Sequence, residues 1–122
     1  MFKIDEKQIS AMEDTARGSF HQRMLIHIAE FFPEHDATLD EEQKRALIDH
    51  GIERGRVYEI VSERDVCIYV DLMLALGPDF DESETYPWAY EILTDDDVRL
   101  PRLKMDRLHA RAIKEIEQRE AV

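Results

Sequence analysis

Apolar positions recur at three- and four-residue steps over most of the chain, which is the period of amphipathic α-helices. The first stripe covers about residues 6–32 and stops before Pro33, whose nitrogen carries no hydrogen for a helical bond. It consists of Ile9, Met12, Ala16, Phe20, Met24, Ile28 and Phe31. This pattern predicts a long N-terminal helix, followed by a loop over residues 34–37.

Helix start and stop signals follow in the next segment. Thr38 and Glu41 have the spacing of a capping box, which predicts that a second helix opens there. The dipeptide His50-Gly51 predicts the end of that helix, because glycine adopts the left-handed conformation common after a last helical turn. A short third helix is expected over residues 52–58.

The most apolar segment runs from Asp65 to Leu76 and is hydrophobic on almost every side. Ser62 and Asp65 resemble a helix start, and the length of the run favours a helix over a buried strand. A helix that is apolar all round is usually the buried centre of a bundle. We therefore expect a central helix with core residues Val66, Tyr69, Val70, Met73, Leu74 and Leu76.

Proline and glycine divide the remaining chain. Gly77-Pro78 ends the apolar helix, Pro87 suits the first position of a short helix, and Pro101 opens a last helix that reaches about Glu120. The last helix is expected to turn Leu103, Leu108, Ala112, Ile113 and Ile116 inward. The sequence thus predicts an all-α fold, a single compact domain over residues 1–122 with five or six helices, frayed at residues 1–5 and 118–122.

The charge of the chain limits its partners. The 122 residues carry a formal net charge of −12. A nucleic-acid binder needs a basic face and a peripheral protein of anionic membranes needs cations, so both classes are disfavoured. No apolar run reaches the length of a membrane-spanning helix, and the N-terminus has no signal-peptide core. The single Cys67, inside an apolar segment, predicts a reducing, cytoplasmic setting.

The charge is concentrated in one part of the chain. Residues 57–98 carry a net charge of −11, whereas residues 99–122 carry +3. Three hypotheses fit: a solvated acidic surface, a docking face for a basic partner, or an acidic segment partly neutralised by the basic C-terminal helix. Acidic and aromatic side chains together suggest an interface. The candidate partner-binding residues are Asp79, Asp81, Glu82, Glu84, Tyr86, Trp88, Tyr90, Asp95, Asp96 and Asp97.

Catalytic and metal-binding motifs are not evident. Asp79, Asp81, Ser83 and Thr85 fall at positions 1, 3, 5 and 7 of an EF-hand count, but Glu84 replaces the required glycine and Tyr90 the bidentate glutamate. The histidines form no zinc-protease motif, and no nucleophile elbow or phosphate loop occurs. We predict a non-catalytic protein without a metal site or cofactor.

One carboxylate stands out, because Asp71 lies within the most apolar helix. An unpaired carboxylate there would be costly. We expect a buried pair with an arginine such as Arg17, Arg23, Arg56 or Arg107; the alternative is a polar group inside a binding groove.

A family resemblance adds a biological setting. The segment Leu76-Gly77-Pro78-Asp79-Phe80-Asp81, followed by Pro87-Trp88-Ala89 and Ile92-Leu93, resembles small helical bacterial proteins encoded beside type VI secretion spike and effector proteins. Gly51-Ile52 with Tyr58, and Leu72-Met73, belong to the same resemblance, which covers about residues 4–110. It implies an accessory protein whose partner is a secreted effector, toxin or spike component. No catalytic residue is implied.

Two roles fit this setting, and both form an interface. An effector chaperone or adaptor shields or links its cargo, and this is the favoured hypothesis; it predicts an exposed apolar groove. An immunity protein blocks a toxin, and an acidic surface suits a toxin with a basic active site. A metal-binding regulatory domain is the third alternative.

Overall fold

The computed structural model describes residues 6–120, with side chains from residue 17 onward. The described residues form six α-helices and one short 3-10 helix, with no strand, which confirms the all-α prediction. Within the predicted domain, contacts cluster into two compact units, residues 1–45 and 46–122. Each unit is described by itself.

The first unit contains α1 (Glu6–Phe31) and α2 (Pro33–Thr38). Phe20, Met24 and Ile28 are buried, as the apolar stripe predicts. The expected loop over residues 34–37 is wrong, because Pro33 occupies the first position of α2, where its missing N–H is not needed. The stripe positions before residue 17 lie outside the described side chains.

The cap of the next helix differs from the prediction. Thr38 is the last residue of α2, and its hydroxyl donates to the His35 carbonyl. The helix α3 (Glu41–Val57) begins instead behind a reciprocal pair. The Asp40 N–H donates to Gln43 Oε1 at 2.9 Å, and the Gln43 N–H donates to Asp40 Oδ1 at 2.7 Å. Aspartate and glutamine thus form the capping box that we had placed at Thr38 and Glu41.

The predicted helix end at Gly51 is also wrong, since α3 continues to Val57. In the second unit Gly51 lies where α3 meets α4 (Glu63–Leu76). A Cβ at this position would lie 2.7 Å from Val70 Cγ2 and 3.1 Å from Met73 Sδ. The glycine therefore permits a close helix–helix approach.

The turn after α3 is a Schellman motif. The Ile60 N–H donates to the Gly55 carbonyl at 2.8 Å and the Glu59 N–H to the Arg56 carbonyl at 3.1 Å. The residue in the left-handed conformation is Glu59, with φ 63°. A non-glycine residue thus holds the position that glycine usually takes.

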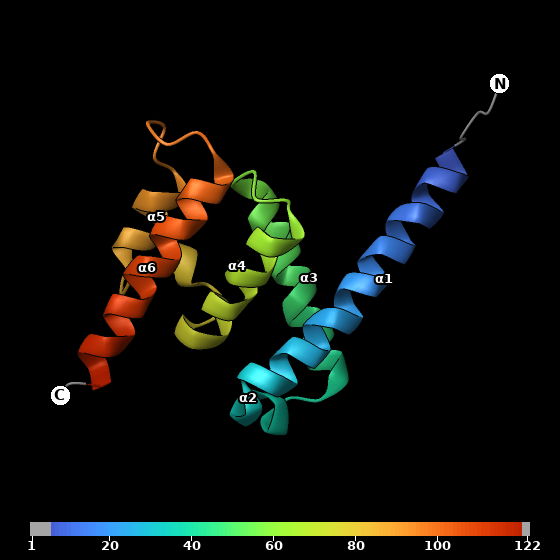
Figure 1. Ribbon diagram of the computed structural model, residues 1–122, viewed down its shortest axis with the longest axis horizontal. Helices are drawn as coiled ribbons and strands as arrows, with labels where there is room; N and C mark the ends of the chain where they lie inside the picture. The colour runs from blue at the N-terminus through green and yellow to red at the C-terminus, as the bar shows by residue number, and fades with distance from the viewer. Residues whose placement is uncertain (1–5, 121–122) are drawn as a thin grey trace. The chain divides into compact units, whose positions relative to one another are not determined.

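The apolar helix predicted between Asp65 and Leu76 is confirmed as α4. The Ser62 side chain accepts from the Asp65 N–H at 3.2 Å, and Gly77, with φ 116°, ends the helix. The predicted core residues are buried, except Leu76, which is half-buried; Leu72 is buried in addition. Because α6 (Pro101–Glu120) and the segment after α4 pack against it, α4 is central to the second unit (Figure 1).

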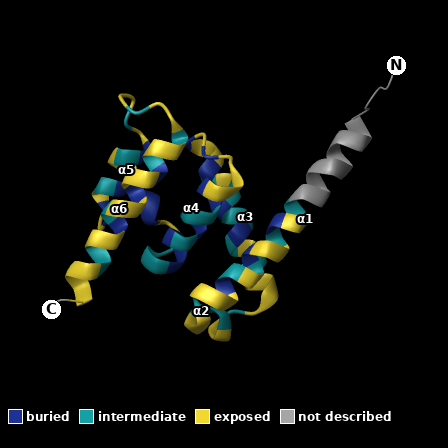
Figure 2. Cartoon of the chain, viewed as in Figure 1, coloured by how far each residue is buried: buried dark blue, intermediate teal, exposed yellow. Residues whose placement is uncertain are grey.

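The remaining elements complete the second unit. The 3-10 helix η1 (Phe80–Glu82) packs against α5 (Pro87–Leu93), and α6 packs against both α4 and α5. Figure 2 shows the alternation of buried and exposed residues along α6.

The inward face of α6 differs from the prediction. Its buried residues are Met105, Leu108 and Ala112, whereas Leu103 and Ile113 are exposed. At 100° per residue, Leu103 lies about 160° and Ile113 about 80° from Met105, so neither falls on the buried stripe.

The chain ends need one further correction. Helix α6 continues to Glu120, so residues 118–120 are helical where fraying was expected. Residues 1–5 and 121–122 lie outside the described residues. None of the helices in the described part of the chain is long and apolar enough to cross a membrane.

Candidate functional site

The acidic segment that the sequence singled out lies wholly in the second unit, on η1, α5 and the turns around them. Its ten candidate residues do not share one environment. Asp81 and Tyr86 are buried, Trp88 and Asp95 are half-buried, and the others are exposed: Asp79, Glu82, Glu84, Tyr90, Asp96 and Asp97. The structure therefore separates candidates that can touch a partner from candidates that hold the fold together.

Asp81 belongs to a buried polar cluster. Its carboxylate is 1% exposed, and its Oδ2 accepts from Arg54 Nε at 3.1 Å, from Arg54 Nη2 at 2.5 Å and from the Tyr58 hydroxyl at 2.8 Å. Arg54 lies in the last turn of α3, and Tyr58 directly follows the helix. The two residues are one turn apart, so both side chains reach η1 from the same side. The Arg54 Nη2 also donates to Glu82 Oε1 at 3.0 Å.

The cluster shifts the pKa values of its members. Burial and the hydrogen bond to Asp81 raise the pKa of Tyr58 to about 12. The hydrogen bond to Asp81 also raises the pKa of Arg54 above its usual range, so the guanidinium stays charged. Burial and the charge of Asp81 raise the pKa of Tyr69, whose ring packs 5.0 Å from that of Phe80. Arg54, Tyr58 and Asp81 thus form a fixed connection between α3 and η1.

Two polar atoms in this cluster are not satisfied. Among the described residues, Asp81 Oδ1 and the Tyr69 hydroxyl are buried without a hydrogen-bond partner. All three bonds to Asp81 converge on Oδ2, which leaves the other oxygen against the core. Both atoms are enclosed, so the cluster gives a surface ligand no access to them.

The residues that match the first positions of an EF-hand loop do not form a calcium-binding loop in the structure, and the reason is where their side chains point. Asp81 would supply a central ligand, but its carboxylate is turned inward to Arg54 and Tyr58. Asp79 lies apart from it and is exposed, with its Oδ1 3.2 Å from His50 Nε2 on α3. Ser83 Oγ accepts from the Thr85 N–H at 3.1 Å and so serves the turn before α5.

The basic helix α6 lies against two aromatic side chains of the acidic segment, the half-buried Trp88 and the buried Tyr86. The Arg111 guanidinium lies 4.9 Å from the Trp88 ring centroid and that of Arg119 lies 5.0 Å from Tyr86. Such cation–π contacts add to the packing of α6 on α5. Lys104 Nζ also donates to the Leu93 carbonyl at the end of α5, at 3.1 Å. The third charge hypothesis is therefore supported, since the basic helix lies against the acidic segment.

The neutralisation is partial. Arg107 Nη1 of α6 lies 3.6 Å from Asp95 Oδ2 of the acidic segment. In the opposite sense, Arg64 of the acidic segment has its Nη2 2.6 Å from Oδ1 of Asp106 on α6, so this pair neutralises no carboxylate of the segment. Within the described residues, Glu84, Glu91, Asp96 and Asp97 have no cationic side chain within 4 Å. Together with Tyr90, which is 54% exposed, these exposed residues before, on and after α5 are called the acidic face: Glu84, Tyr90, Glu91, Asp96 and Asp97.

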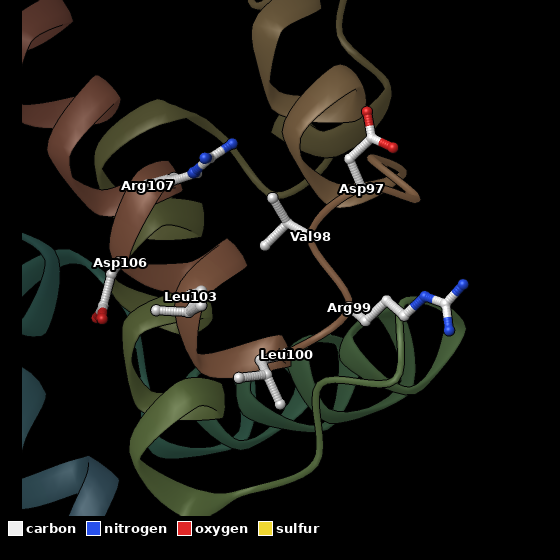
Figure 3. A pocket seen from close by; sticks show the side chains of 7 residues that line it. All are labelled: Asp97, Val98, Arg99, Leu100, Leu103, Asp106 and Arg107. Carbon is white, nitrogen blue, oxygen red and sulfur yellow. The ribbon is translucent and has the colours of Figure 1, made fainter.

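A shallow groove adjoins the turn of the acidic face that precedes α6. It has a volume of about 590 Å³ and is lined by Asp97, Val98, Arg99, Leu100, Leu103, Asp106 and Arg107. Leu100 is 63% exposed and Leu103 is 48% exposed. In Figure 3 the Arg99 guanidinium extends away from the apolar side chains, while Arg107 extends from α6 toward Val98. The groove is thus an apolar patch with a charged rim.

Sequence reasoning did not place Arg54 or Tyr58 in a polar cluster, and it predicted Tyr69 only as a core residue, which it is. The spacing of Arg54 and Tyr58 places them on one helix face, which was a usable signal, but nothing in the sequence indicated that Asp81 would be their partner. Asp71, which we had singled out, is half-buried on α4. Its pairing with an arginine stays a prediction.

Comparison with known proteins gives no further assignment. No family model matches the chain, and neither curated proteins nor solved structures show a significant similarity to it.

Proposed function

We propose that the protein is a non-catalytic protein-interaction module that binds a basic partner through the acidic face. The observation that carries this proposal is the set of exposed carboxylates, on either side of Tyr90 in the sequence, that have no cation within 4 Å among the described residues. Carboxylates without partners attract a basic protein over a long range, and an exposed aromatic ring supplies a contact once the partner has arrived.

The resemblance supplies the proposed setting. In that setting the protein acts in the bacterial cytoplasm as a chaperone or adaptor of a type VI secretion effector. The exposed groove at Leu100 and Leu103 supports the adaptor hypothesis over the immunity hypothesis, because an adaptor has to hold an apolar part of its cargo.

The test begins with the partner that the protein captures from its native host. The association rate of the pair is then measured over a salt series, for the wild type and for a variant with Glu84→Lys, Asp96→Lys and Asp97→Lys. We expect the variant to associate at least about tenfold more slowly at low salt, because steering depends on the local potential. The difference should vanish at high salt.

A matched control distinguishes the effect of charge at the acidic face from the effect of the net charge of the whole protein. The exchange of Glu30, Glu34 and Glu42 for lysine changes the net charge equally, but these exposed residues belong to the first unit. We expect this control to keep most of the association rate. Equal rates for wild type and both variants at every salt concentration would contradict the proposal. The captured partner also distinguishes the two roles, because an immunity protein abolishes the toxin's activity and an adaptor leaves it intact.

A further inference from the structure

Two aromatic rings around the start of α5, those of Tyr86 and Trp88, are covered by arginines of the chain itself. The ring centroids lie 5.7 Å apart in an edge-to-face arrangement. The guanidinium of Arg111 lies 4.9 Å from the Trp88 centroid, and that of Arg119 lies 5.0 Å from the Tyr86 centroid. A guanidinium is planar and weakly hydrated, so it stacks on an aromatic face more readily than the ammonium of lysine. The occupants that the rings already have therefore indicate an arginine site.

The part of α6 that carries Arg119 is weakly attached to the rest of the second unit. We call residues 113–120, which are about the last two turns of α6, the C-terminal strap. The buried residues of α6 end at Ala112, and the strap contains only exposed and half-buried residues (Figure 2). Glu117 and Glu120 lie near the C-terminus of the helix, where a negative charge opposes the helix dipole. A segment without buried apolar side chains opens at a low free energy, so the strap can leave while the rest of α6 stays packed.

Arg119 holds the strap on Tyr86 through a contact that a partner can supply instead. Among the described residues, no carboxylate lies within 4 Å of the Arg119 guanidinium, so its contact is the ring. Glu84 is exposed, lies two positions before Tyr86 in the chain and has no cation within 4 Å in the described part of the structure. An incoming basic segment can thus use both the ring and a carboxylate that the strap leaves unused.

We propose that a basic segment of the partner displaces the C-terminal strap and places an arginine on Tyr86. The inference rests on the proposed function and names the chemistry of the partner: the acidic face attracts a basic protein, and the aromatic rings then select arginine over lysine. The strap competes with the partner for the same site. The apparent affinity is therefore reduced in proportion to the fraction of molecules in which the strap is open, and a weaker strap should strengthen binding.

The experiment uses the full-length protein and two synthetic probes of equal charge, heptaarginine and heptalysine. Trp88 is the only tryptophan of the chain, so its fluorescence reports on the aromatic rings. We expect heptaarginine to change this fluorescence and to bind at least about threefold more tightly than heptalysine. In nuclear magnetic resonance spectra of the wild type with heptaarginine, the amide signals of residues 113–120 should become those of a disordered segment, while residues 105–112 stay helical. This measurement needs no variant.

Three variants test the competition. Arg119→Ala weakens the strap and should tighten heptaarginine binding about two- to fivefold, as expected for the loss of one exposed cation–π contact that keeps the site closed. The matched control is Lys114→Ala, which removes the same charge from an exposed position of the strap and should change the affinity by no more than about 1.5-fold. Tyr86→Leu keeps an apolar side chain but removes the ring, and it should abolish the preference for arginine over lysine.

The possible results distinguish this inference from the proposed function. Equal binding of the two peptides, an unchanged Trp88 signal or a strap that stays helical in the complex overturns the displacement and leaves the acidic face intact as a docking surface. Equal affinities of Arg119→Ala and the wild type, or no binding of heptaarginine, also overturn it. The proposed function fails separately, through the salt series with the captured partner.

Discussion

The Asp81 carboxylate accepts two hydrogen bonds from the Arg54 guanidinium, and the two residues lie 27 positions apart in the sequence. This pair joins the last turn of α3 to the 3-10 helix that precedes α5. It also gives one of the candidate docking residues a structural role, because a side chain that is 1% exposed cannot meet a partner.

Removal of Asp81 should therefore destabilise the fold. We expect Asp81→Ala to lower the free energy of unfolding by about 3 kcal/mol, since it leaves Arg54 and the Tyr58 hydroxyl without their buried acceptor. The matched control is Glu82→Ala, whose 63% exposed side chain binds the same arginine and should contribute less than about 1 kcal/mol. Urea unfolding measures both. Equal losses for the two variants would contradict a special role for Asp81.

Because the pKa of the Tyr58 hydroxyl is raised, we expect the stability of the fold to depend on pH in the alkaline range. Its pKa is raised to about 12, whereas an unfolded tyrosine titrates near 10. A raised pKa gives stability that is fully present below about pH 10 and is lost as the pH rises toward 12, because the unfolded state loses its proton first. Tyr58→Phe should be less stable than the wild type at pH 9 and equally stable near pH 12. Denaturant unfolding at a series of pH values tests this; a constant difference would refute it.

The exchange of glycine for alanine should have opposite effects on stability at two sites: Gly51, at the contact between α3 and α4, and Gly18 in α1. Gly51→Ala should destabilise by about 1–3 kcal/mol, because the new Cβ would overlap the short, stiff side chain of Val70. Gly18→Ala in α1 meets no atom within 4 Å and should stabilise by up to about 1 kcal/mol through helix propensity. Thermal melting of both variants measures the two changes in stability, which should have opposite signs.

A double-mutant cycle localises the overlap. Val70→Ala should cost less in the Gly51→Ala background than alone, because it removes the methyl group nearest to the new Cβ. Additive costs would show that the destabilisation at Gly51 has another origin.

The Schellman turn predicts a stabilising substitution. Glu59 has φ 63°, a conformation that costs a side chain about 1–2 kcal/mol but costs glycine nothing. Glu59→Gly should gain about 0.5–1 kcal/mol, since the greater freedom of the unfolded glycine offsets part of the benefit. Glu59→Ala removes the same side chain but keeps the Cβ, and it should bring no such gain. Equal gains in chemical denaturation would point to the glutamate charge instead of the backbone.

The sequence determined the helical elements that depend on local signals. The periodic stripe, the serine cap of α4 and the stops at Pro33 and Gly77 all act within a few residues, so these boundaries could be predicted. The errors arose where two local signals competed. Thr38 and Asp40 both offered a cap, and Gly51 could end a helix or allow a close contact.

The tertiary structure decided which candidate side chains face the solvent. Asp81 and Asp97 are both acidic and both lie a few residues after a helix end, so no local rule separates them. The difference arises because α3 brings Arg54 and Tyr58 to Asp81, whereas no described cation reaches Asp97. Only the packing of distant segments fixes such partners, because burial of a charge depends on what the rest of the chain places beside it.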